Sequence, residues 1–378
     1  MAHAPRPTRV TRAGLPRGSI PLAIVVILSI ALLFLFAPSR RAAASVAGAL
    51  ALDASLPEMV PPGVVLRVGD PVDRWVFQHL GWDKALPFRI EWAEITGGPG
   101  TTEAFHAGAL DVGYGANVPP IHARWSGIPV RIVAFRQFAQ DAGKALYTFG
   151  LAPGSNIRTI GDLRGKRIAF SPSQVQAQVV LETLRAAGID RRDVTLVELP
   201  SSIGGDVYTS SLASNEVDAA PLRVGLVTHR YLTKYGDRGA RLLAHPPFRD
   251  GGALLYVPET VLADPGKAAA LRIFVRYWGR AIAWTNAHPE ELARGYYAGR
   301  RGLPIADARI EVGALGPTTV PSGWNDAIAF QQGAIDILAP ATGRPRFDAA
   351  TLFDRRFETI AAQGMKEEEA CPHCLAQR

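Results

Sequence analysis

The chain has 378 residues, of which 48% are hydrophobic and 20% charged, a globular composition that excludes a disordered chain. The formal net charge is +7, but residues 1–62 carry six arginines against two acidic residues, so the remainder is close to neutral. No run of Lys or Arg interrupts that remainder, and a nucleic-acid-binding surface is therefore not expected.

An apolar stretch without a charged residue occupies residues 20–37, and four arginines precede it. This pattern predicts a Sec-type signal or a membrane anchor, with everything after it exported. Arg40 and Arg41 favour an uncleaved anchor, whereas the small residues at 47–49 match a cleavage site, and both alternatives stay open. No cysteine directly follows the stretch, so a lipoprotein anchor is not expected.

Short apolar runs alternate with helical stretches from Val64 onward. The expected strands lie at 64–68, 88–92, 111–114 and 130–135, with helices at 74–80, 102–109 and 119–126. The rhythm restarts with strands at 167–170, 194–199 and 217–220 and helices at 174–187 and 206–213. After Gly252 the expected elements are helices at 265–287, 290–298 and 324–338. The order predicts an α/β fold of two units, each a parallel-dominated sheet flanked by helices.

Ligands of open parallel sheets bind at the carboxyl ends of strands, so the loops at those ends are the candidate sites. Gly98, Thr101 and Thr102 follow the second strand, where glycines admit a ligand and a helix start offers free N–H groups. An ordinary turn with a helix cap explains the same residues equally well. No Gly-Lys-Ser/Thr follows, so the loop is not a phosphate-binding P-loop.

Two further helix starts carry polar side chains. Asn117 precedes two prolines and is either a plain N-cap or an amide that faces a ligand. Ser171, Ser173 and Gln174 show the spacing of a capping box with proline at the first helical position. The two serines lie where an anion would meet the start of that helix.

Asp70 ends the first strand, and Arg74 and Arg223 are the arginines expected nearest the cleft. Either arginine can bind an oxyanion through two parallel hydrogen bonds, although a solvated surface arginine is the alternative for both. The predicted ligand-binding residues are Asp70, Arg74, Gly98, Thr101, Thr102, Asn117, Ser171, Ser173, Gln174 and Arg223.

Several segments, in this order and spacing, resemble the aliphatic sulfonate, taurine and nitrate receptors of ABC importers. They are the runs at 66–69, 98–114, 119–121, 160–169 and 216–219 and the helix around Phe330-Gln331-Gln332. The resemblance covers about 64–357. It implies a two-lobed periplasmic-binding-protein fold of type II, with two hinge crossovers and a ligand cleft between the lobes.

The implied domains are a signal or anchor with linker (1–62), a discontinuous first lobe (63–152 plus 250–360), a second lobe (153–249) and a loose tail (361–378). The resemblance also implies a monomeric, non-enzymatic receptor, without metal or cofactor, in the periplasm or on the outer face of the membrane. It would close around a small anion and deliver it to an ABC permease and its ATPase subunit.

This chain departs from the family pattern in two places. Many members have Gly-Asp where this chain has Ala116-Asn117, and their aromatic stretch after the Asp-Ala strand is replaced by residues 221–225. An uncharged Asn and an added Arg both favour a more anionic ligand, and a sulfonate is expected.

Three alternatives stay open. Thiamine-pyrimidine precursor-binding proteins and synthase-like enzymes share this fold, but the body of this chain lacks the cysteine-rich motif of those enzymes. The pair in Cys371-Pro372-His373-Cys374 has redox spacing, yet it follows a charged run where a loose tail or an incidental disulfide is expected. A membrane-anchored sensor or scavenger without a permease would have the same sequence pattern.

Overall fold

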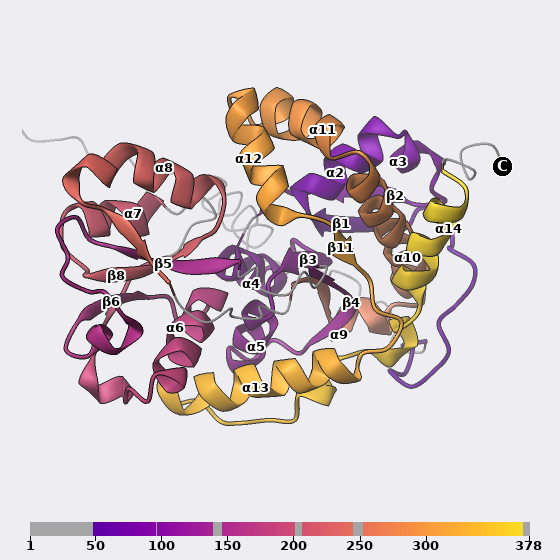
Figure 1. Ribbon diagram of the computed structural model, residues 1–378. Coiled ribbons are helices and arrows are strands. Elements are labelled where there is room, and N and C mark those ends of the chain that lie inside the picture. The colour runs from indigo at the N-terminus through magenta and orange to yellow at the C-terminus, as the bar shows by residue number, and fades with distance from the viewer. Residues whose placement is uncertain (1–47, 96, 139–145, 201–205, 245–251, 373–378) are drawn as a thin grey trace, which may run out of the picture. The chain divides into compact units, whose positions relative to one another are not determined.

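The computed structural model describes residues 48–95, 97–138, 146–200, 206–244 and 252–372 (Figure 1). The described residues from Ala49 onward form one compact unit. The predicted signal or anchor at 20–37 lies outside the described residues. Within the described ranges, no helix is both long and apolar enough to cross a membrane.

The first sheet has the strand order β11-β4-β10-β3-β1-β2. Its strands are β1 (Val65–Gly69), β2 (Arg89–Trp92), β3 (Val112–Gly115), β4 (Val130–Phe138), β10 (Ala253–Pro258) and β11 (Thr318–Thr319). β1 pairs in parallel with β2 and β3, whereas β10 runs antiparallel to β3 and β4, and β11 antiparallel to β4.

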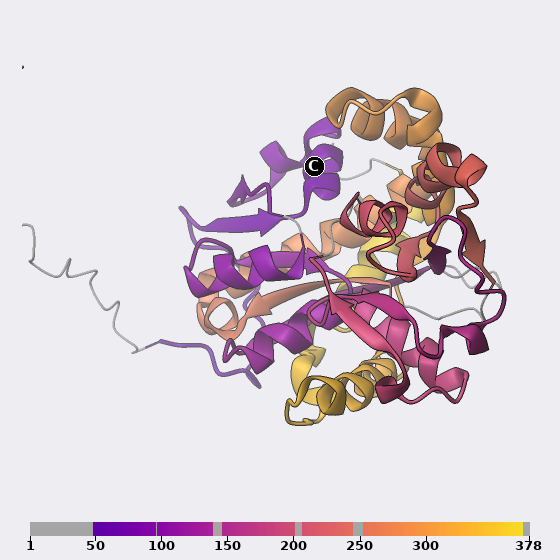
Figure 2. The same ribbon diagram turned by 90° about the vertical axis from the view of Figure 1, so that its left-hand side faces the viewer.

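The second sheet has the order β7-β6-β8-β5-β9, and its elements face the viewer in Figure 2. Its strands are β5 (Tyr147–Leu151), β6 (Arg167–Phe170), β7 (Thr195–Glu198), β8 (Ala219–Arg223) and β9 (Arg241–Leu243). β6 is parallel to β7 and β8, while β5 is antiparallel to β8 and β9.

Both sheets are therefore mixed, which corrects the expected parallel dominance. The chain leaves the first sheet after β4 and enters the second at β5, then leaves after β9 and returns at β10. The antiparallel pairs all include β4, β5 or β10, which border the two passages. Antiparallel neighbours need no crossover helix between them. β5 starts the second sheet at Tyr147, earlier than the expected lobe boundary at 153, and the lobe boundaries stay a prediction.

Helices cover the two sheets (Figure 1). Around the first sheet they include α2 (Pro71–His79), α3 (Trp82–Ala85), α4 (Gly98–His106), α5 (Val118–Trp125), α9 (Glu259–Ala263) and α10 (Pro265–Ala287). The second sheet carries α6 (Val175–Ala186), α7 (Asp206–Ala213) and α8 (Leu226–Tyr235). The later helices are α11 (Pro289–Leu292), a π-helix (Ala293–Arg300), α12 (Ile305–Leu315), α13 (Asn325–Thr342) and α14 (Ile360–Ala370).

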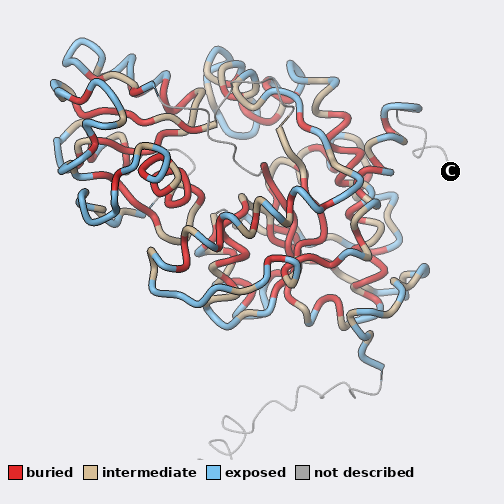
Figure 3. Tube along the Cα trace, turned by 60° about the horizontal axis from the view of Figure 1, so that its bottom comes forward, coloured by how far each residue is buried: buried red, intermediate tan, exposed pale blue. Residues whose placement is uncertain are grey.

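Aromatic packing joins the first sheet to α10. The Phe77 ring lies 5.5 Å from the Phe274 ring, 5.7 Å from Trp82 and 5.6 Å from Trp92, measured between ring centroids. Figure 3 shows that buried residues gather in the interior while exposed ones follow the periphery. Dense packing of this kind makes the sheet rigid, and a rigid sheet holds the polar side chains at its strand ends in fixed positions.

The expected loose tail is a docked helix as far as Ala370. α14 packs against α10 at two glycines, since an added Cβ on Gly279 or on Gly364 would lie 1.8 Å from a backbone oxygen of the other helix. The Arg280 guanidinium, buried beside these contacts, donates to the Glu368 carboxylate at 2.8 Å. From the sequence, the charged run at 366–369 was expected to be solvated, because Arg280, the partner of Glu368, lies 88 positions earlier in the chain. Cys374 lies outside the described residues.

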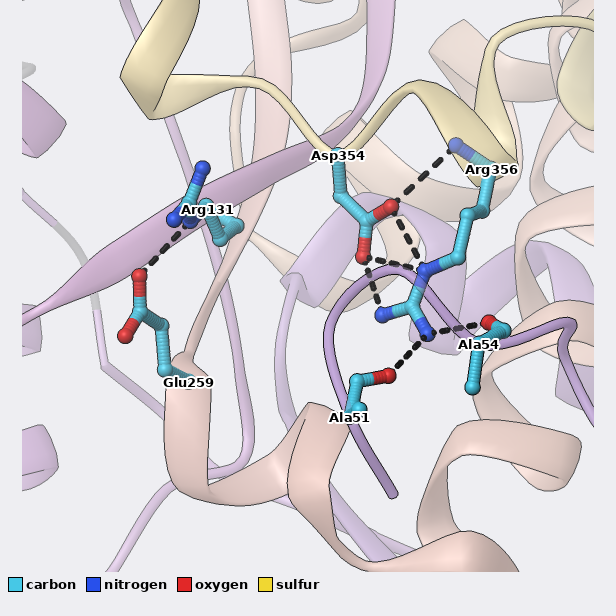
Figure 4. Close-up of polar contacts among 6 residues, drawn as sticks. All are labelled: Ala51, Ala54, Arg131, Glu259, Asp354 and Arg356. Atoms are coloured by element: carbon cyan, nitrogen blue, oxygen red, sulfur yellow. Dashed lines mark hydrogen bonds and ion pairs between the residues drawn. The ribbon is translucent and has the colours of Figure 1, made fainter.

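The segment that follows residue 48 is fastened to the body of the first sheet. The Arg356 guanidinium, held by Asp354, donates to the backbone oxygens of Ala51 at 3.2 Å and Ala54 at 2.8 Å (Figure 4). The Leu50 N–H also donates to the Ala263 oxygen at 2.8 Å. Residues 50–54 are therefore part of the folded unit rather than a free linker.

Candidate ligand site

Two buried carboxyl groups lie at the carboxyl end of β1. Asp70 caps α2, since its Oδ1 accepts the N–H groups of Val72 and Asp73, each at 3.1 Å. Asp70 and Asp73 are 2% and 3% exposed, and burial raises the pKa of both, that of Asp73 strongly because Asp70 is close by. The pair therefore binds a proton more tightly than two separate carboxyl groups would, and that proton belongs to the pair.

Arg136, near the carboxyl end of β4, faces these carboxyl groups. It donates a hydrogen bond to the Tyr114 hydroxyl on β3, and its guanidinium lies 5.4 Å from the Tyr114 ring centroid. Burial opposes its charge, but Tyr114, Asp73 and Asp70 together raise the pKa of Arg136. Its Nε atom is buried without a hydrogen-bond partner among the described residues. Arg136 therefore stays charged and keeps donor capacity.

Arg223, the last residue of β8 in the second sheet, interacts electrostatically with the same tyrosine. Its Nη1 lies 2.8 Å from Oε1 of Glu311 on α12, and its side chain is 24% exposed. Burial opposes its charge, but Glu311 and then Tyr147, Tyr297 and Tyr114 raise the pKa of Arg223. Both arginines thus lie within electrostatic range of Tyr114 although they come from different sheets.

These residues form one group, called here the arginine–tyrosine cluster: Arg136, Arg223, Tyr114, Tyr147, Tyr297 and Glu311. Burial raises the pKa of Tyr114 and of Tyr297, so both phenols are neutral at physiological pH and able to donate a hydrogen bond. The cluster offers two cations, phenol donors and aromatic surface, a set suited to an oxyanion with an organic body.

The start of α4 uses its hydroxyl groups internally. Thr101 and Thr102 donate to the backbone oxygens of Gly97 and Gly98 at 3.0 and 2.8 Å, bonds that lie within the first turn. Gly98 is required for packing, because a Cβ there would lie 2.9 Å from Pro119. Both Thr hydroxyl protons are therefore used in hydrogen bonds within α4. The backbone at Gly97 lies close to the second sheet's elements, since a Cβ there would lie 3.7 Å from the Gln174 amide nitrogen.

Asn117 has the N-cap position of α5 but makes no capping bond with its side chain. Its amide nitrogen donates to Gln178 Oε1 on α6 at 2.7 Å, and its backbone oxygen accepts from Gln331 on α13 at 2.7 Å. The interpretation of Asn117 as a cap alone is therefore wrong. Its side chain ties helices of the two sheets together, and its Oδ1 is buried without a hydrogen-bond partner in the described part of the chain.

Ser171 is buried in the second sheet's own interior. Its hydroxyl donates to the Leu199 oxygen and accepts from the Tyr208 hydroxyl at 2.8 Å. The expected capping box is absent, because α6 starts at Val175 with Gln174 at the N-cap. Ser173 and Gln174 are only half-buried, and they lie near Gly97 and Gly98.

Arg74 makes a different contact from the one expected. It pairs with Glu94, which also accepts from Arg300 at 2.8 Å, at a partly exposed place. Arg136, which the sequence interpretation missed, lies beside the carboxyl groups instead. The signal that would have found it is an arginine inside a long apolar strand, at 130–138.

Two surface hollows of the described chain lie elsewhere. One of about 460 Å³ is lined by Arg158 and Ala187 among others, and one of about 700 Å³ is lined by Trp75 and His288 among others. Neither is lined by a predicted ligand-binding residue. The predicted ligand-binding residues and Arg136 are themselves buried or half-buried.

Comparison with known proteins agrees with this architecture. A family model described as NMT1/THI5 like matches residues 78–292. The chain is 28% identical over 246 residues to an aliphatic sulfonates-binding protein of Escherichia coli (strain K12), a match that covers 63% of this chain and 75% of the relative.

Solved structures share the fold. The alkanesulfonate-binding protein SsuA from Xanthomonas axonopodis pv. citri, bound to MOPS, is 24% identical with a TM-score of 0.62, over 79% of this chain and 99% of that one. The periplasmic aliphatic sulphonate binding protein SsuA from Escherichia coli is 22% identical with a TM-score of 0.63, over the same shares. The desulfurization enzyme DSZB is 16% identical with a TM-score of 0.50, over 79% and 98%. The expected two-sheet periplasmic-binding-protein fold is confirmed, and this fold serves both binding proteins and enzymes.

Proposed function

Because the chain belongs to the NMT1/THI5-like family, we propose that it is an extracytoplasmic solute-binding protein of an ABC importer. Its ligand is a small organic anion of the sulfonate type, bound between the two sheets. The protein delivers this ligand to a permease and its ATPase subunit, and it is held at the outer face of the membrane or released into the periplasm. The names of the relatives support the sulfonate, since one is an aliphatic sulfonates-binding protein and another was solved with MOPS.

Two observations support this proposal: Arg136 donates a hydrogen bond to Tyr114, and Arg223 from the other sheet interacts electrostatically with the same phenol. Each arginine belongs to a different sheet, so an oxyanion bound by both would join the two halves of the unit. Guanidinium groups match the planar spread of oxyanion acceptors, and they hold their charge when partly buried. Ligand binding would then favour closure, as in other two-lobed receptors.

The other predicted residues have supporting places in this proposal. Asp70 caps the start of α2 and, after Tyr114 and Asp73, helps to raise the pKa of Arg136. Ser173 and Gln174 face the backbone at Gly97 and Gly98, the other candidate contact between the halves. Thr101, Thr102, Asn117 and Ser171 shape the surrounding helices, and Arg74 stays on the rim with Glu94.

Calorimetric titration of the purified full chain in detergent tests the proposal. The panel holds ethanesulfonate, MOPS, taurine, nitrate, sulfate and a thiamine-type pyrimidine. We expect one sulfonate to bind per chain, and Arg136→Ala to weaken it at least about tenfold, since a hydrogen bond to a charged group contributes roughly 1.5–3 kcal/mol.

The matched control is Arg131→Ala on the same strand, where Arg131 pairs with Glu259 at 2.7 Å (Figure 4). This variant should keep the affinity of the wild type. If only the pyrimidine bound, the anion assignment would be wrong, and the family's alternative of a thiamine-pyrimidine ligand would replace it.

A further inference from the structure

One contact in the arginine–tyrosine cluster places a negative charge where a ligand anion would bind. Glu311 Oε1 lies 2.8 Å from Arg223 Nη1, and Glu311 is only 9% exposed. Burial, and after it the charge of Glu311, raises the pKa of the Tyr297 phenol, so the two groups interact electrostatically. The carboxylate therefore occupies donor positions on Arg223 that an oxyanion would use.

We propose that Glu311 is an internal competitor for the anion site: in the absence of ligand it neutralises Arg223, and the ligand's head group replaces it. This inference rests on the proposed function, because it names the residue against which that ligand must compete. Glu311 thereby sets the charge that a ligand needs in order to bind.

The local backbone brings this carboxylate to Arg223. Gly225, two residues after Arg223, has φ +111, and a Cβ there would lie 2.5 Å from Ala314 Cβ on α12 and 3.8 Å from Glu311 Oε2. Any larger residue at 225 would push α12 away. The glycine allows the close approach that turns Glu311 into a partner of Arg223.

A second ion pair allows Glu311 to release Arg223 without undocking of α12. Arg230 on α8 pairs with Asp307 at 2.6 Å, one turn before Glu311 on α12. Residues at i and i+4 share a helix face, so both acids face the second sheet's elements. Asp307 keeps α12 docked through Arg230, while Glu311 pairs with Arg223, the arginine that the ligand would also bind.

The two arginines of the cluster are thus unequal. Arg136 has an unpartnered Nε and a neutral phenol as its hydrogen-bond acceptor, whereas Arg223 already has a carboxylate. A ligand can bind Arg136 directly but must displace a full negative charge at Arg223. Only a ligand that is itself fully ionised compensates for this, so Glu311 discriminates against neutral analogues.

The test compares Glu311→Gln with Asp326→Asn in the full chain, by calorimetric titration with ethanesulfonate and taurine. Glu311→Gln removes the competing charge at nearly constant shape, and we expect ethanesulfonate and taurine both to bind about tenfold more tightly. Asp326 is an exposed acid on α13 outside the cluster, and the affinities of Asp326→Asn should stay within about twofold of wild type.

Unchanged or weaker ethanesulfonate binding in Glu311→Gln would overturn the inference. So would weaker binding of taurine alone, because Glu311 would then recognise the ligand's ammonium group. Glu311→Asp gives a second variant that keeps the charge but withdraws it from Arg223, and it should tighten binding partly. The proposed function fails separately, if wild-type protein binds none of the anions.

Discussion

The arginine–tyrosine cluster and the helix starts near Gly98 and Ser171 differ in how their polar atoms are used. In the cluster, Arg136 has a buried Nε without a hydrogen-bond partner among the described residues, and Arg223 is paired with the Glu311 carboxylate. At the helix starts, the hydroxyls of Thr102 and Ser171 donate to backbone oxygens of their own half. Some polar residues at strand ends therefore use their hydrogen-bonding atoms to stabilise the fold, whereas others keep donors that a ligand could use.

The largest effect is expected from Arg223→Ala. This variant removes a charged donor to the proposed ligand and leaves the Glu311 carboxylate unpaired beside the anion. We therefore expect the sulfonate affinity to fall about a hundredfold, near the upper end of roughly 1.5–3 kcal/mol for a hydrogen bond to a charged group. Calorimetric titration measures it. Arg230→Ala is the control, since Arg230 pairs with Asp307 at 2.6 Å on the same side of the second sheet. Equal losses in both variants would place the effect in the docking of α12 instead.

Ser171→Ala should act on stability rather than on binding. It leaves the Leu199 oxygen and the Tyr208 hydroxyl without their partner in a buried place, and we expect the free energy of unfolding to fall by about 2 kcal/mol. Urea denaturation gives this number, and the sulfonate affinity should stay within about twofold. A tenfold loss of affinity at unchanged stability would instead make Ser171 a ligand contact, as its position after a strand suggested.

Asp73→Asn tests the shared proton at the base of the cluster. Burial, together with Asp70, raises the pKa of Asp73 well above its ordinary value of 3.8. The folded protein then holds a proton that the unfolded chain releases, so the stability of the wild type falls as pH rises from the unfolded pKa to the folded pKa. For one proton the steepest fall is about 1.4 kcal/mol per pH unit, and the Asn variant should flatten it.

Denaturation midpoints from pH 4 upward, measured in roughly half-unit steps, follow the change across the range where carboxyl groups titrate. The exposed Asp326→Asn on α13 serves as a control and should leave the profile as it is. A profile that is equally steep in Asp73→Asn and in wild type would contradict the shared proton.

The smallest effect is expected from Thr102→Val. The Thr102 hydroxyl donates to the Gly98 oxygen within its own helix turn at 2.8 Å, an internal bond of low net value. We expect a stability change below about 0.5 kcal/mol and no change in sulfonate affinity. Any clear loss of affinity would mean that the hydroxyl turns toward the ligand on closure.

Much of the fold could be predicted because the periodic signals were strong. α10 spans Pro265–Ala287 and β6 spans Arg167–Phe170, as expected from the pattern. β10 (Ala253–Pro258) was missed because a fully buried strand shows no alternation, and α14 because its partner lies about 90 positions earlier in the chain. Pairing between distant segments leaves little trace in local periodicity.

The residues of the candidate site were harder to predict from the sequence, for a related reason. Arg223 was expected near the cleft, and it lies in the arginine–tyrosine cluster. Arg136 was missed because the expected strand ended at Phe135, whereas β4 continues to Phe138. Hydroxyl groups such as that of Ser171 looked available, since their backbone acceptors belong to segments that only folding brings close.

The fastening at Arg356 has a mechanical consequence if the predicted span at 20–37 remains in the membrane. Tension on such a tether first reaches the bond from Leu50 to Ala263 and then the bond from Arg356 to Ala51. From Arg356 it passes to Asp354, and it reaches β4 through the Asp354 N–H, which donates to the Ile132 oxygen at 3.0 Å. This load path ends inside the first sheet and avoids the two chain passages to the second sheet. Thermal forces on the membrane span would then act on the first sheet and leave the second sheet unloaded, and the ligand-driven closure proposed above would be independent of the tether.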